Sequence, residues 1–562
     1  MDRAERPWLS SYEPEVPPTL DYPPETVDSL LKSAAARFGN RTAISFFGRR
    51  TNYRELLRRS LQFAHNIRKL GLRKGDRVAL MLPNMPAYVV AYYGTFLAGG
   101  VVAQTNPLYT ERELETQLAD CGARWIVCLD LLYARVCSVK PRTPLQAVIV
   151  TGIADDLPAV KRWLYPWMQK RKKAPIAKIP PNEPAIRLYP WLDTAEAPDD
   201  PVHNAPDDLA VLQYTGGTTG RPKGAMLTHA NLTANVRQCR AWLHRAREGE
   251  EVALGAVPFF HVYGMTVAMN FAVSIGATMT LIPKFEPDLL LGAIRGTRPT
   301  MFPGAPTMYL SVLKHPKHRP GDLASIRVCV SGSAPLPLDV QQEFELKSGG
   351  KLVEGYGLSE ASPVTHANPI WGENRTGTIG LPWPDTDCRI VDTDTGEPLG
   401  PGQIGELQIR GPQVMRGYWN RPEETAAAFD DGWLRTGDLA SMDEQGYFRI
   451  VERLKDMINC GGFKVYPREV EEVLFEHPAV REAAVVGVPD GYRGETVKAF
   501  VVRQSGVTED ELNRFCRERL AAYKVPRQYE FVDALPKSAV GKVLRRLLKE
   551  RTESGSDGEG KS

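Results

Sequence analysis

Cysteine pairs with metal-ligand or disulfide spacing are missing from this 562-residue chain. Its eight cysteines, at positions 121, 128, 137, 239, 329, 388, 460 and 516, include no CxxC pair. The pattern argues against a zinc ribbon or a disulfide scaffold and predicts reduced, mostly buried thiols of a cytoplasmic protein. An excess of one charge is missing too, since 70 Lys and Arg stand against 67 Asp and Glu. A net charge of +3 gives no indication of a nucleic-acid partner.

A secretory signal is also absent from the first residues, MDRAERPWLSSYEPEVPPTL, which contain charges and prolines but no apolar core. Two uncharged runs, 87–103 and 257–283, reach or approach the length of a membrane span. Both contain glycines, and both read as a buried helix, a glycine turn and a buried strand. We therefore predict that neither run crosses a membrane.

Short β-rich runs such as RTAISFF, RVALMLP and RWIVCLD alternate with helical segments such as NYRELLRRSLQFAHNIRKLG. This alternation predicts an α/β fold with largely buried sheets. After residue 455 the pattern changes to helix PREVEEVLFEH, strands VREAAVVGVPD and ETVKAFVVR, and helix TEDELNRFCRERLAAY. We interpret this part as a separate α+β domain of about 100 residues, followed by a disordered tail.

The interval 163–184 is rich in proline and lysine and interrupts the alternation. Trp163, Tyr165 and Trp167 stand there beside the basic run at 170–173. Aromatic and basic residues together suit the surface of a membrane. A solvated loop with a few packed aromatics is the alternative, and composition alone favours it.

The stretch YTGGTTGRPKG, residues 214–224, has the composition of a phosphate-binding loop. It is not a Walker A loop, because Pro222 precedes Lys223 and Gly224 follows it. Its glycines can expose backbone N–H groups, its threonines offer hydroxyls, and Lys223 adds a positive charge. The strand LAVLQYT before it and the helix THANLTANVRQCRAWL after it place the loop where open α/β sheets bind ligands. A glycine-rich hairpin without a ligand is the alternative.

This loop resembles the signature loop of the adenylate-forming superfamily of acyl-CoA ligases, luciferases and peptide-synthetase adenylation domains. Further matching motifs follow in order: SGSAPLP, EGYGLSEASP, GWLRTGDLA, RLKDMINCGGFKVYP and PKSAVGKVLRR. The phrases AGGVVAQTNPLYTERELE, PFFHVYG, FPGAPTMY and GPQVMRGYWNRPEETAAAF are most similar to bacterial long-chain fatty-acid–CoA ligases. The resemblance covers nearly the whole chain.

The resemblance implies two half-reactions. A fatty-acid carboxylate attacks the α-phosphate of ATP, with Mg²⁺ bound, and the thiol of coenzyme A then displaces AMP. It also implies a large multi-sheet N-terminal domain (1–452) with the ATP and acyl sites, and a small mobile α+β domain (453–550). The hinge is expected at 452–457 and a disordered tail at 551–562; rotation of the small domain would separate the half-reactions. A homodimer and a peripheral membrane contact of this cytoplasmic protein are further expectations.

Three residues carry the expected chemistry. By resemblance, Lys542 contacts the carboxylate and the α-phosphate, although a lysine in a basic segment is otherwise a surface residue. Glu360 resembles the Mg²⁺ ligand, together with the hydroxyl of Thr215. His261 either lies against the acyl and pyrophosphate region or is a satisfied core histidine. Ser359 replaces the threonine of many relatives and keeps the hydroxyl.

The remaining assignments also rest on the resemblance. ATP or AMP binding is expected of Thr215, Gly216, Gly217, Thr218, Thr219, Gly220, Lys223, Ser333, Ala334, Glu354, Gly355, Tyr356, Gly357, Ser359, Asp438 and Arg453. Coenzyme A binding is expected of Gly461, Gly462 and Lys464, and acyl binding of His261, Val262, Tyr263 and Gly264.

Three other functions fit parts of this pattern. The chain could charge a carrier protein instead of coenzyme A, although no carrier segment with an attachment serine follows Lys542. A luciferase-like oxygenase shares the motifs. A non-catalytic nucleotide sensor is disfavoured, because Lys542, Glu360 and Asp438 are all retained.

Overall fold

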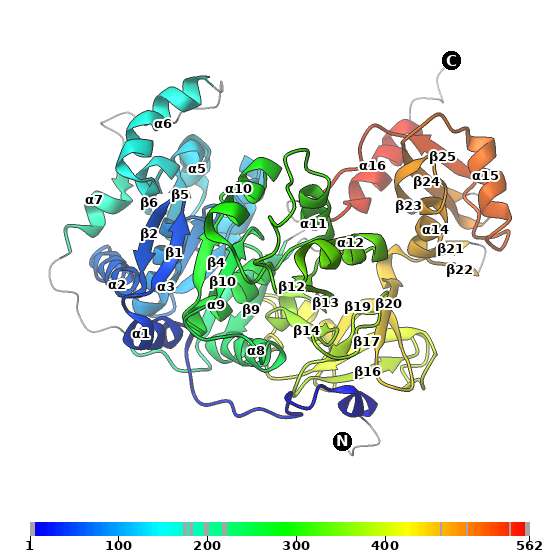
Figure 1. The fold of residues 1–562 in the computed structure, drawn as a ribbon, viewed down its shortest axis with the longest axis horizontal. Helices are drawn as coiled ribbons and strands as arrows, with labels where there is room; N and C mark the ends of the chain where they lie inside the picture. The colour runs from blue at the N-terminus through cyan, green and yellow to red at the C-terminus, as the bar shows by residue number, and fades with distance from the viewer. Residues whose placement is uncertain are drawn as a thin grey trace. The chain divides into compact units, whose positions relative to one another are not determined.

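The structure is a computed structural model that describes residues 6–171, 177, 179, 184–195, 202–215, 222–460, 463–490, 493–538 and 541–556 (Figure 1). The chain forms two compact units. The larger unit comprises Trp8–Asp387 and Arg410–Leu434. The smaller unit comprises Met1–Pro7, Cys388–Ile409 and Arg435–Ser562. The sequence places the domain boundary at 452–453 instead, and the hinge at 452–457 stays a prediction.

A seven-stranded sheet organises the first part of the larger unit. Its strand order is β7 (Ala185–Arg187), β6 (Ala147–Thr151), β5 (Trp125–Leu129), β3 (Arg77–Met81), β4 (Val101–Gln104), β8 (Leu209–Thr215) and β9 (Lys223–Thr228). All neighbours are parallel except β8 and β9. The strands are apolar on both faces, as expected for a parallel sheet covered by helices. The predicted α/β class is confirmed.

Helices cover this sheet. They include α2 (Tyr53–Lys69), α3 (Pro86–Leu97), α4 (Glu111–Cys121), α5 (Tyr133–Val139) and α8 (His229–Trp242). On one face, Leu114 and Leu118 of α4 and Val136 of α5 pack against Ile126 and Cys128 of β5. Every residue of α3 is buried, which explains why its sequence lacks an amphipathic pattern. The helix–turn–strand interpretation of 87–103 is therefore confirmed.

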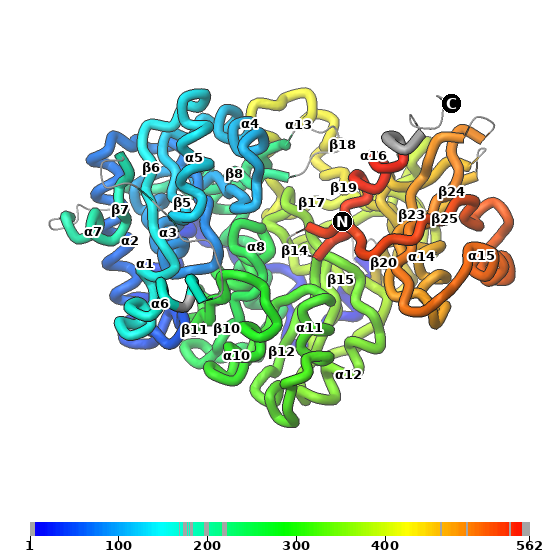
Figure 2. Tube along the Cα trace, turned by 90° about the horizontal axis from the view of Figure 1, so that it is seen from above, coloured from blue at the N-terminus to red at the C-terminus, as the bar shows by residue number. Residues whose placement is uncertain are grey.

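Two four-stranded sheets follow in the larger unit. One has the order β10 (Val252–Gly255), β11 (Thr278–Leu281), β1 (Thr42–Phe46) and β2 (Arg49–Asn52). The other has β12 (Val328–Ser331), β13 (Lys351–Gly357), β14 (Val364–Ala367) and β15 (Leu381–Pro382). Figure 2 shows the trace of the chain through β10, β11, β12 and β14 from above. The second uncharged run is a buried helix and strand as predicted, but most of its helix is a π-helix, η6 (Gly264–Asn270). Among the described residues, no helix has the length and apolar character to cross a membrane.

The smaller unit contains β17 (Gly405–Arg410), β19 (Trp433–Met442) and β20 (Phe448–Arg453), in which β19 pairs with the other two. Its second sheet has the order β22 (Phe463–Val465), β21 (Ile458–Cys460), β24 (Gly494–Arg503) and β23 (Val480–Asp490), with β25 (Gln528–Phe531) beside β24. Val485 and Val497 face one apolar cluster, whereas Val486 and Phe500 face another that contains Leu548 of α16 (Arg545–Ser556). The alternation of strand side chains thus lets helices pack on both faces.

Three details differ from the sequence predictions. The helix predicted over residues 508–523 ends early, as α15 (Glu509–Arg517). Helix α16 continues to Ser556, past the start of the predicted disordered tail, and 557–562 lie outside the described residues. The segment after the glycine loop is not immediately helical, because β9 precedes α8 and runs antiparallel to β8.

Candidate active site

The glycine-rich loop joins the two strands of a hairpin at the edge of the seven-stranded sheet. Thr215, the last residue of β8, is the register partner of Lys223, the first of β9. The connection is therefore a hairpin in topology, which the sequence left as the alternative to a strand–loop–helix phosphate site. Gly216, Gly217, Thr218, Thr219 and Gly220 lie outside the described residues.

A hydrogen-bonded triad fixes the base of this hairpin. The Tyr214 hydroxyl donates to Asp120 Oδ2 at 2.6 Å, and Arg421 Nη2 donates to Asp120 Oδ1 at 2.6 Å. On the other strand, the Trp419 N–H donates to the Gly224 carbonyl at 2.8 Å. Each side of the hairpin is thus attached to the segment around 418–421, which restricts where the loop can lie.

Tyr418 connects two of the predicted site residues. Its hydroxyl donates to Glu360 Oε1 at 2.9 Å, and the ammonium of Lys223 lies 5.2 Å from the centre of its ring. A cation over an aromatic face is attracted by the ring quadrupole. The arrangement therefore orients the predicted phosphate-binding lysine and the predicted metal ligand through one side chain.

Glu360 lies in the 3₁₀ turn η7 (Ser359–Ala361), which packs against β8 and β9. The Met415 N–H donates to the Glu360 carbonyl at 2.7 Å and holds this turn. Gly357, just before it, is required by space, because a Cβ there would lie 2.1 Å from the Pro363 carbonyl oxygen. A carboxylate oriented by a tyrosine, next to a strand that ends in a threonine hydroxyl, offers hard oxygen donors of the kind Mg²⁺ prefers.

The predicted adenine-binding residues lie at the ends of β12 and β13. Tyr356 is opposite His366 on β14, with ring centroids 5.9 Å apart. Complete burial lowers the pKa of His366 to about 3, so the imidazole beside Tyr356 is neutral at physiological pH. Glu354 Oε2 accepts from the Leu336 N–H at 3.0 Å, and Ser333 has a left-handed backbone with φ of 74°. Such a conformation in a non-glycine residue is concentrated at functional sites.

The predicted acyl-binding segment leads into the π-helix η6. Val262, Tyr263 and Gly264 are buried, and the Tyr263 hydroxyl donates to the Val330 carbonyl at 2.6 Å. His261 Nδ1 accepts weakly from the Tyr263 N–H at 3.4 Å. Gly264 is necessary here, because a Cβ would lie 2.3 Å from the Pro258 carbonyl oxygen. π-Helices are rare and occur frequently at functional sites.

In the smaller unit, Lys542 lies in a charged cluster. It follows Gly541, whose φ is 80°, in a turn closed by the Ser538 N–H, which donates to the Lys542 carbonyl at 2.8 Å. Asp438 and Arg453 are register partners on β19 and β20, with Arg453 Nε 3.6 Å from Asp438 Oδ1. Three residues that the sequence predicts from different motifs are therefore brought together.

The electrostatics of the cluster act on Lys542. Burial is the main cause that lowers its pKa to about 7, and Arg453 and Lys455 lower it further, whereas Asp438 and Asp456 oppose the shift. Burial and Arg453 also lower the pKa of Lys455. A lysine in this state gains a full positive charge when an anion arrives beside it, since negative charge raises its pKa.

The predicted hinge and coenzyme A segments lie next to this cluster in the sequence. Residues 452–457 form the end of β20 and the 3₁₀ turn η8 (Leu454–Asp456). Lys464 Nζ lies 3.6 Å from Asp394 Oδ2 in an exposed ion pair. Gly461 and Gly462, which the resemblance predicts to bind coenzyme A, lie outside the described residues.

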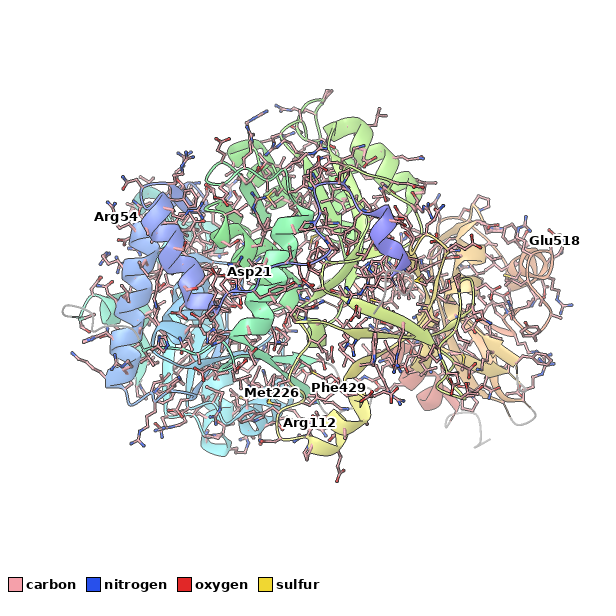
Figure 3. The ribbon with its side chains drawn as sticks, turned by 90° about the horizontal axis from the view of Figure 1, so that it is seen from below. Asp21, Arg54, Arg112, Met226, Phe429 and Glu518 are labelled. Atoms are coloured by element: carbon pink, nitrogen blue, oxygen red, sulfur yellow. The ribbon has the colours of Figure 1, made fainter. Side chains whose placement is uncertain are left out.

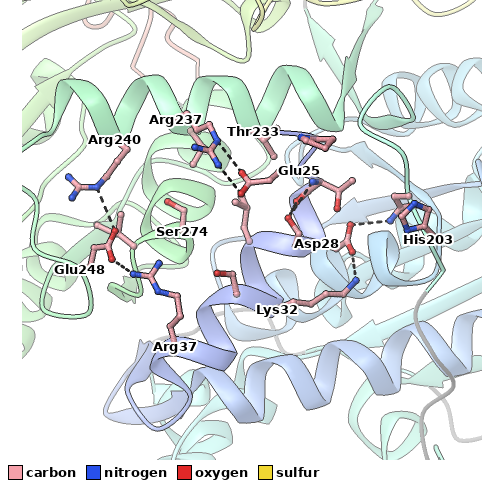
Figure 4. Close-up of a pocket in the computed structure, with 18 of the residues that line it drawn as sticks. Glu25, Asp28, Lys32, Arg37, His203, Thr233, Arg237, Arg240, Glu248 and Ser274 are labelled. Atoms are coloured by element: carbon pink, nitrogen blue, oxygen red, sulfur yellow. Dashed lines mark hydrogen bonds and ion pairs between the residues drawn. The ribbon is translucent and has the colours of Figure 1, made fainter. Parts of the chain in front are cut away.

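A cavity of about 620 Å³ elsewhere in the larger unit contains none of the predicted site residues. It lies between α1 (Val27–Phe38) and α8, and Figure 4 shows its charged side chains. These charges are largely paired with one another, as Lys32 is with Asp28 at 2.6 Å and Arg237 with Glu25 at 2.8 Å. The cavity therefore presents little uncompensated charge to a ligand.

Comparison with known proteins assigns the family. The profile of the AMP-binding enzyme family matches residues 31–419. The chain belongs to the AMP-binding enzyme family. The profile of the AMP-binding enzyme C-terminal domain matches 469–542, a range that ends at Lys542. The predicted membership of the adenylate-forming superfamily is thus confirmed.

Known proteins resemble the chain over almost its whole length. A long-chain-fatty-acid–CoA ligase of Bacillus subtilis (strain 168) is 52% identical over 555 residues, which are 98% of this chain and 99% of the relative. The long-chain-fatty-acid–CoA ligase of Escherichia coli O157:H7 is 40% identical over 572 residues, with 98% and 99% coverage. A feruloyl-CoA synthase of Amycolatopsis sp is 39% identical over 515 residues, with 91% and 96% coverage.

Solved structures of the family share the fold. ATP-bound MatB from Rhodopseudomonas palustris has a TM-score of 0.83 at 32% identity, covering 94% of this chain and 99% of that one. The anthranilate CoA ligase AuaEII, in complex with anthranoyl-AMP, has a TM-score of 0.84 at 26% identity, covering 96% and 99%. These matches confirm the predicted two-domain α/β architecture.

Sequence reasoning missed two residues of the site. Tyr418 belongs to a phrase that resembles the family, GPQVMRGYWN, but nothing in its spacing points to Glu360 or Lys223. Lys455 lies in the predicted hinge and acts on the pKa of Lys542, 87 positions away in the chain by the difference of the two numbers. Both depend on tertiary contacts that no local pattern records.

Proposed function

We propose that this chain is an AMP-forming long-chain fatty-acid–CoA ligase. The observation that carries the proposal is the 52% identity, over nearly the full length of both proteins, to a long-chain-fatty-acid–CoA ligase. The overall reaction joins a fatty acid and coenzyme A in a thioester and converts ATP to AMP and pyrophosphate. ATP, a fatty acid and coenzyme A are then the substrates.

In the first half-reaction, a carboxylate oxygen forms a bond to the α-phosphorus of ATP and the bond to the pyrophosphate oxygen breaks. Both reactants are anions, so positive charge must offset their repulsion in the transition state. Lys542 supplies it at the α-phosphate and the attacking carboxylate, and Lys223 with its loop binds the phosphates that leave. The low pKa of Lys542 in the free protein means that the substrates themselves complete its protonation.

In the second half-reaction, the sulfur of coenzyme A forms a bond to the acyl carbon and AMP leaves with the electron pair of the broken bond. Asp438 and Arg453 hold the ribose of AMP in this proposal, and the segment with Gly461, Gly462 and Lys464 borders the thiol. Rotation about 452–457 would exchange Lys542 for this segment, as hinge motions of small domains do.

Mg²⁺ is the metal that the residues fit. Glu360 and Thr215 would bind it, with Tyr418 orienting the carboxylate. When bound, Mg²⁺ neutralises charge on the phosphate oxygens. The role of Glu360 itself is to place one carboxylate beside the β8–β9 hairpin, where the polyphosphate is expected.

The identity of the thiol that accepts the acyl group distinguishes a coenzyme A ligase from a ligase that charges a carrier protein. Purified protein with palmitate and ATP is expected to release AMP in stoichiometric amounts with palmitoyl-CoA when coenzyme A is present. If AMP release required an acyl carrier protein and ignored coenzyme A, the ligase proposal would fail. Light emission or oxygen uptake would indicate the luciferase-like alternative, and nucleotide binding without AMP release would indicate a sensor.

We also infer that an anionic membrane surface is a partner of α6 (Ala159–Arg171). Trp163 and Trp167 are 81% and 60% exposed, and the helix contains four basic and no acidic residues. Exposed tryptophans beside lysines and arginines suit the headgroup region of a bilayer, where long-chain fatty acids also partition. Figure 1 shows α6 at the periphery of the larger unit.

Vesicle sedimentation tests this contact. The protein is expected to bind vesicles that contain phosphatidylglycerol, and the double variant W163A/W167A is expected to bind them several-fold less. Leu346→Ala is the matched control, because Leu346 is 85% exposed on a different helix, α12 (Leu338–Ser348). Equal binding of both variants would exclude α6 as the contact. The homodimer stays a prediction, which light scattering tests.

A further inference from the structure

An N-terminal arm, residues 8–24, packs on the rest of the larger unit through polar and aromatic contacts. The Tyr12 hydroxyl donates to the Pro382 carbonyl at 2.6 Å, and its ring meets that of Trp242 edge to face at 5.5 Å. Farther along, the Leu20 N–H and the Tyr22 hydroxyl both donate to Asp385 at 2.8 Å. Figure 3 shows this arm with Asp21 labelled.

Between these contacts the arm brings two carboxylates to one histidine. His244 lies two residues beyond the end of α8, and its Nε2 is 3.7 Å from Glu13 Oε2 and 3.8 Å from Glu15 Oε2. One ligand atom from each residue lies within 4.8 Å of the others. The Glu13 and His244 side chains are 6% and 12% exposed, whereas Glu15 is 55% exposed. The group is therefore enclosed by protein on one side and open to water on the other.

The imidazole of His244 is left unsatisfied by the described part of the chain. Both ring nitrogens are buried and have no hydrogen-bond partner among the described residues. The distances to the two carboxylates are too long for hydrogen bonds. A buried polar group without a partner is costly, so most such groups in proteins bind another group or an ion. Here one imidazole and two carboxylates each bring a possible ligand atom within 4.8 Å of the others.

The orientation of Glu13 supports a ligand at that point. Its other oxygen, Oε1, accepts from the Trp371 N–H at 3.0 Å, which fixes the carboxylate plane. The His244 ring packs against the Trp371 ring with centroids 4.6 Å apart. A carboxylate held by an outer hydrogen bond is typical of metal sites, and ring packing holds the imidazole here.

We propose that Glu13, Glu15 and His244 bind a divalent transition-metal ion of the Zn²⁺ type. Imidazole nitrogen with carboxylate oxygen suits Zn²⁺, whereas Mg²⁺ and Ca²⁺ prefer oxygen alone. Bond lengths to tetrahedral Zn²⁺ place neighbouring ligand atoms about 3.4 Å apart, slightly less than the 3.7 and 3.8 Å observed. A small rotation of the exposed Glu15 shortens the 3.8 Å distance, and a slight shift between His244 and Glu13 shortens the 3.7 Å distance. Water completes the coordination.

The ion would fasten the N-terminal arm to the end of α8. The site is separate from the ligase residues, so it goes beyond the proposed function and does not depend on it. Because the ion binds the folded arm and not the unfolded chain, it is expected to raise the melting temperature.

Cobalt binding to the untagged, chelator-treated full chain tests the proposal, without ATP, coenzyme A or Mg²⁺. We expect one equivalent of Co²⁺ with the visible spectrum of a nitrogen and oxygen site, displaced by Zn²⁺, and a melting temperature about 2–4 °C higher at saturation. Glu15→Gln is expected to weaken the affinity about tenfold or more. Because Glu15 is exposed, this substitution is expected to leave the fold intact, so a loss of affinity reports on the site. His244→Ala supplies a second test.

Asp288→Asn is the matched control. Asp288 is an exposed carboxylate that lies 3.4 Å from His315 Nε2. This pair resembles the proposed site but has one carboxylate beside the histidine instead of two. The control is expected to bind Co²⁺ as the parent does. Three results would each overturn the proposal: no stoichiometric Co²⁺ binding, thiolate charge-transfer bands that place the ion on cysteines, or parental affinity in Glu15→Gln.

Discussion

Asp438 and Arg453 face each other across β19 and β20, with their charged groups 3.6 Å apart, and together they control the charge of Lys542. Arg453 lowers the pKa of Lys542 and Asp438 raises it, while burial is the largest cause of the shift to about 7. The lysine is thus kept only partly protonated in the free protein. Its charge becomes complete when anionic substrates bind.

Loss of Lys542 is expected to stop adenylation and to spare ATP binding. Lys542→Ala removes the charge that offsets anion repulsion in the transition state, and we expect the rate to fall about 100-fold to 1,000-fold or more. Pyrophosphate release measures the rate, and calorimetry measures ATP affinity. Lys537→Ala is the control, since Lys537 belongs to the same segment but pairs with Glu482 at 2.8 Å. Pyrophosphate release at the parental rate would contradict the role of Lys542.

The pH dependence of adenylation reports the charge of Lys542 directly. Its pKa in the folded protein is about 7, so kcat/KM for adenylation is expected to decline as the pH rises through about 7. Asp438→Asn should move this decline to lower pH, and Lys455→Met should move it to higher pH, because Asp438 raises the lysine pKa and Lys455 lowers it. Shifts of both variants in the same direction would disprove the electrostatic account.

The lowered pKa of Lys542 also makes the free energy of unfolding depend on pH. The folded-state pKa of about 7 is below the ordinary lysine value of 10.5, so the unfolded chain binds more protons between these values. The free energy of unfolding therefore rises with pH across that window. Lys542→Met is expected to raise the melting temperature most below pH 7 and to have no such effect above pH 10.5. Thermal denaturation over this pH range measures the difference.

Tyr418→Phe is expected to raise the Mg²⁺ concentration needed for half-maximal adenylation. The variant loses the 2.9 Å hydrogen bond that orients Glu360 but keeps the ring beneath Lys223. Outer partners of metal ligands typically contribute about 10-fold to 100-fold to metal affinity. Titration of activity with Mg²⁺ measures the change, with Tyr165→Phe on α6 as the control. An unchanged Mg²⁺ requirement would remove Tyr418 from this role.

Two glycines in helical segments should respond in opposite ways to alanine. At Gly264 a Cβ would lie 2.3 Å from the Pro258 carbonyl oxygen, and we expect Gly264→Ala to destabilise the protein by about 1–3 kcal/mol. At Gly292, in α10 (Pro287–Thr297), nothing lies within 4 Å, and Gly292→Ala should stabilise by up to about 1 kcal/mol. Denaturant unfolding compares them. Equal stabilities would show that the π-helix tolerates a side chain there.

Local patterns were sufficient for most elements. The strand VREAAVVGVPD was predicted from its alternation and is β23 with the same ends. The predicted helix continues six residues past Arg517, the last residue of α15, because the apolar pattern continues there while the helical backbone does not. The helix THANLTANVRQCRAWL after the glycine loop was predicted and is α8, but the strand β9 before it was not, because periodicity does not assign so short a run as KGAMLT.

The residues of the candidate site also fall into those that the sequence predicted and those that it did not. Lys542, Asp438, Arg453 and Glu360 were found because each lies in a motif of the family, and the geometry brings the first three together. Tyr418 and Lys455 were missed because their partners lie 58 and 87 residues away, by the differences in residue number. His244 was missed for the same reason, since its carboxylates come from the N-terminal arm.

Competition among acids of graded length tests the central claim most directly. Purified protein is given ATP, Mg²⁺, coenzyme A and an equimolar mixture of short, medium and long fatty acids with benzoate and ferulate, and mass spectrometry quantifies the acyl-CoA products. A long-chain fatty-acid–CoA ligase predicts that long-chain acyl-CoA dominates from the earliest times. Equal product from every acid, or a preference for the aromatic acids, would contradict it.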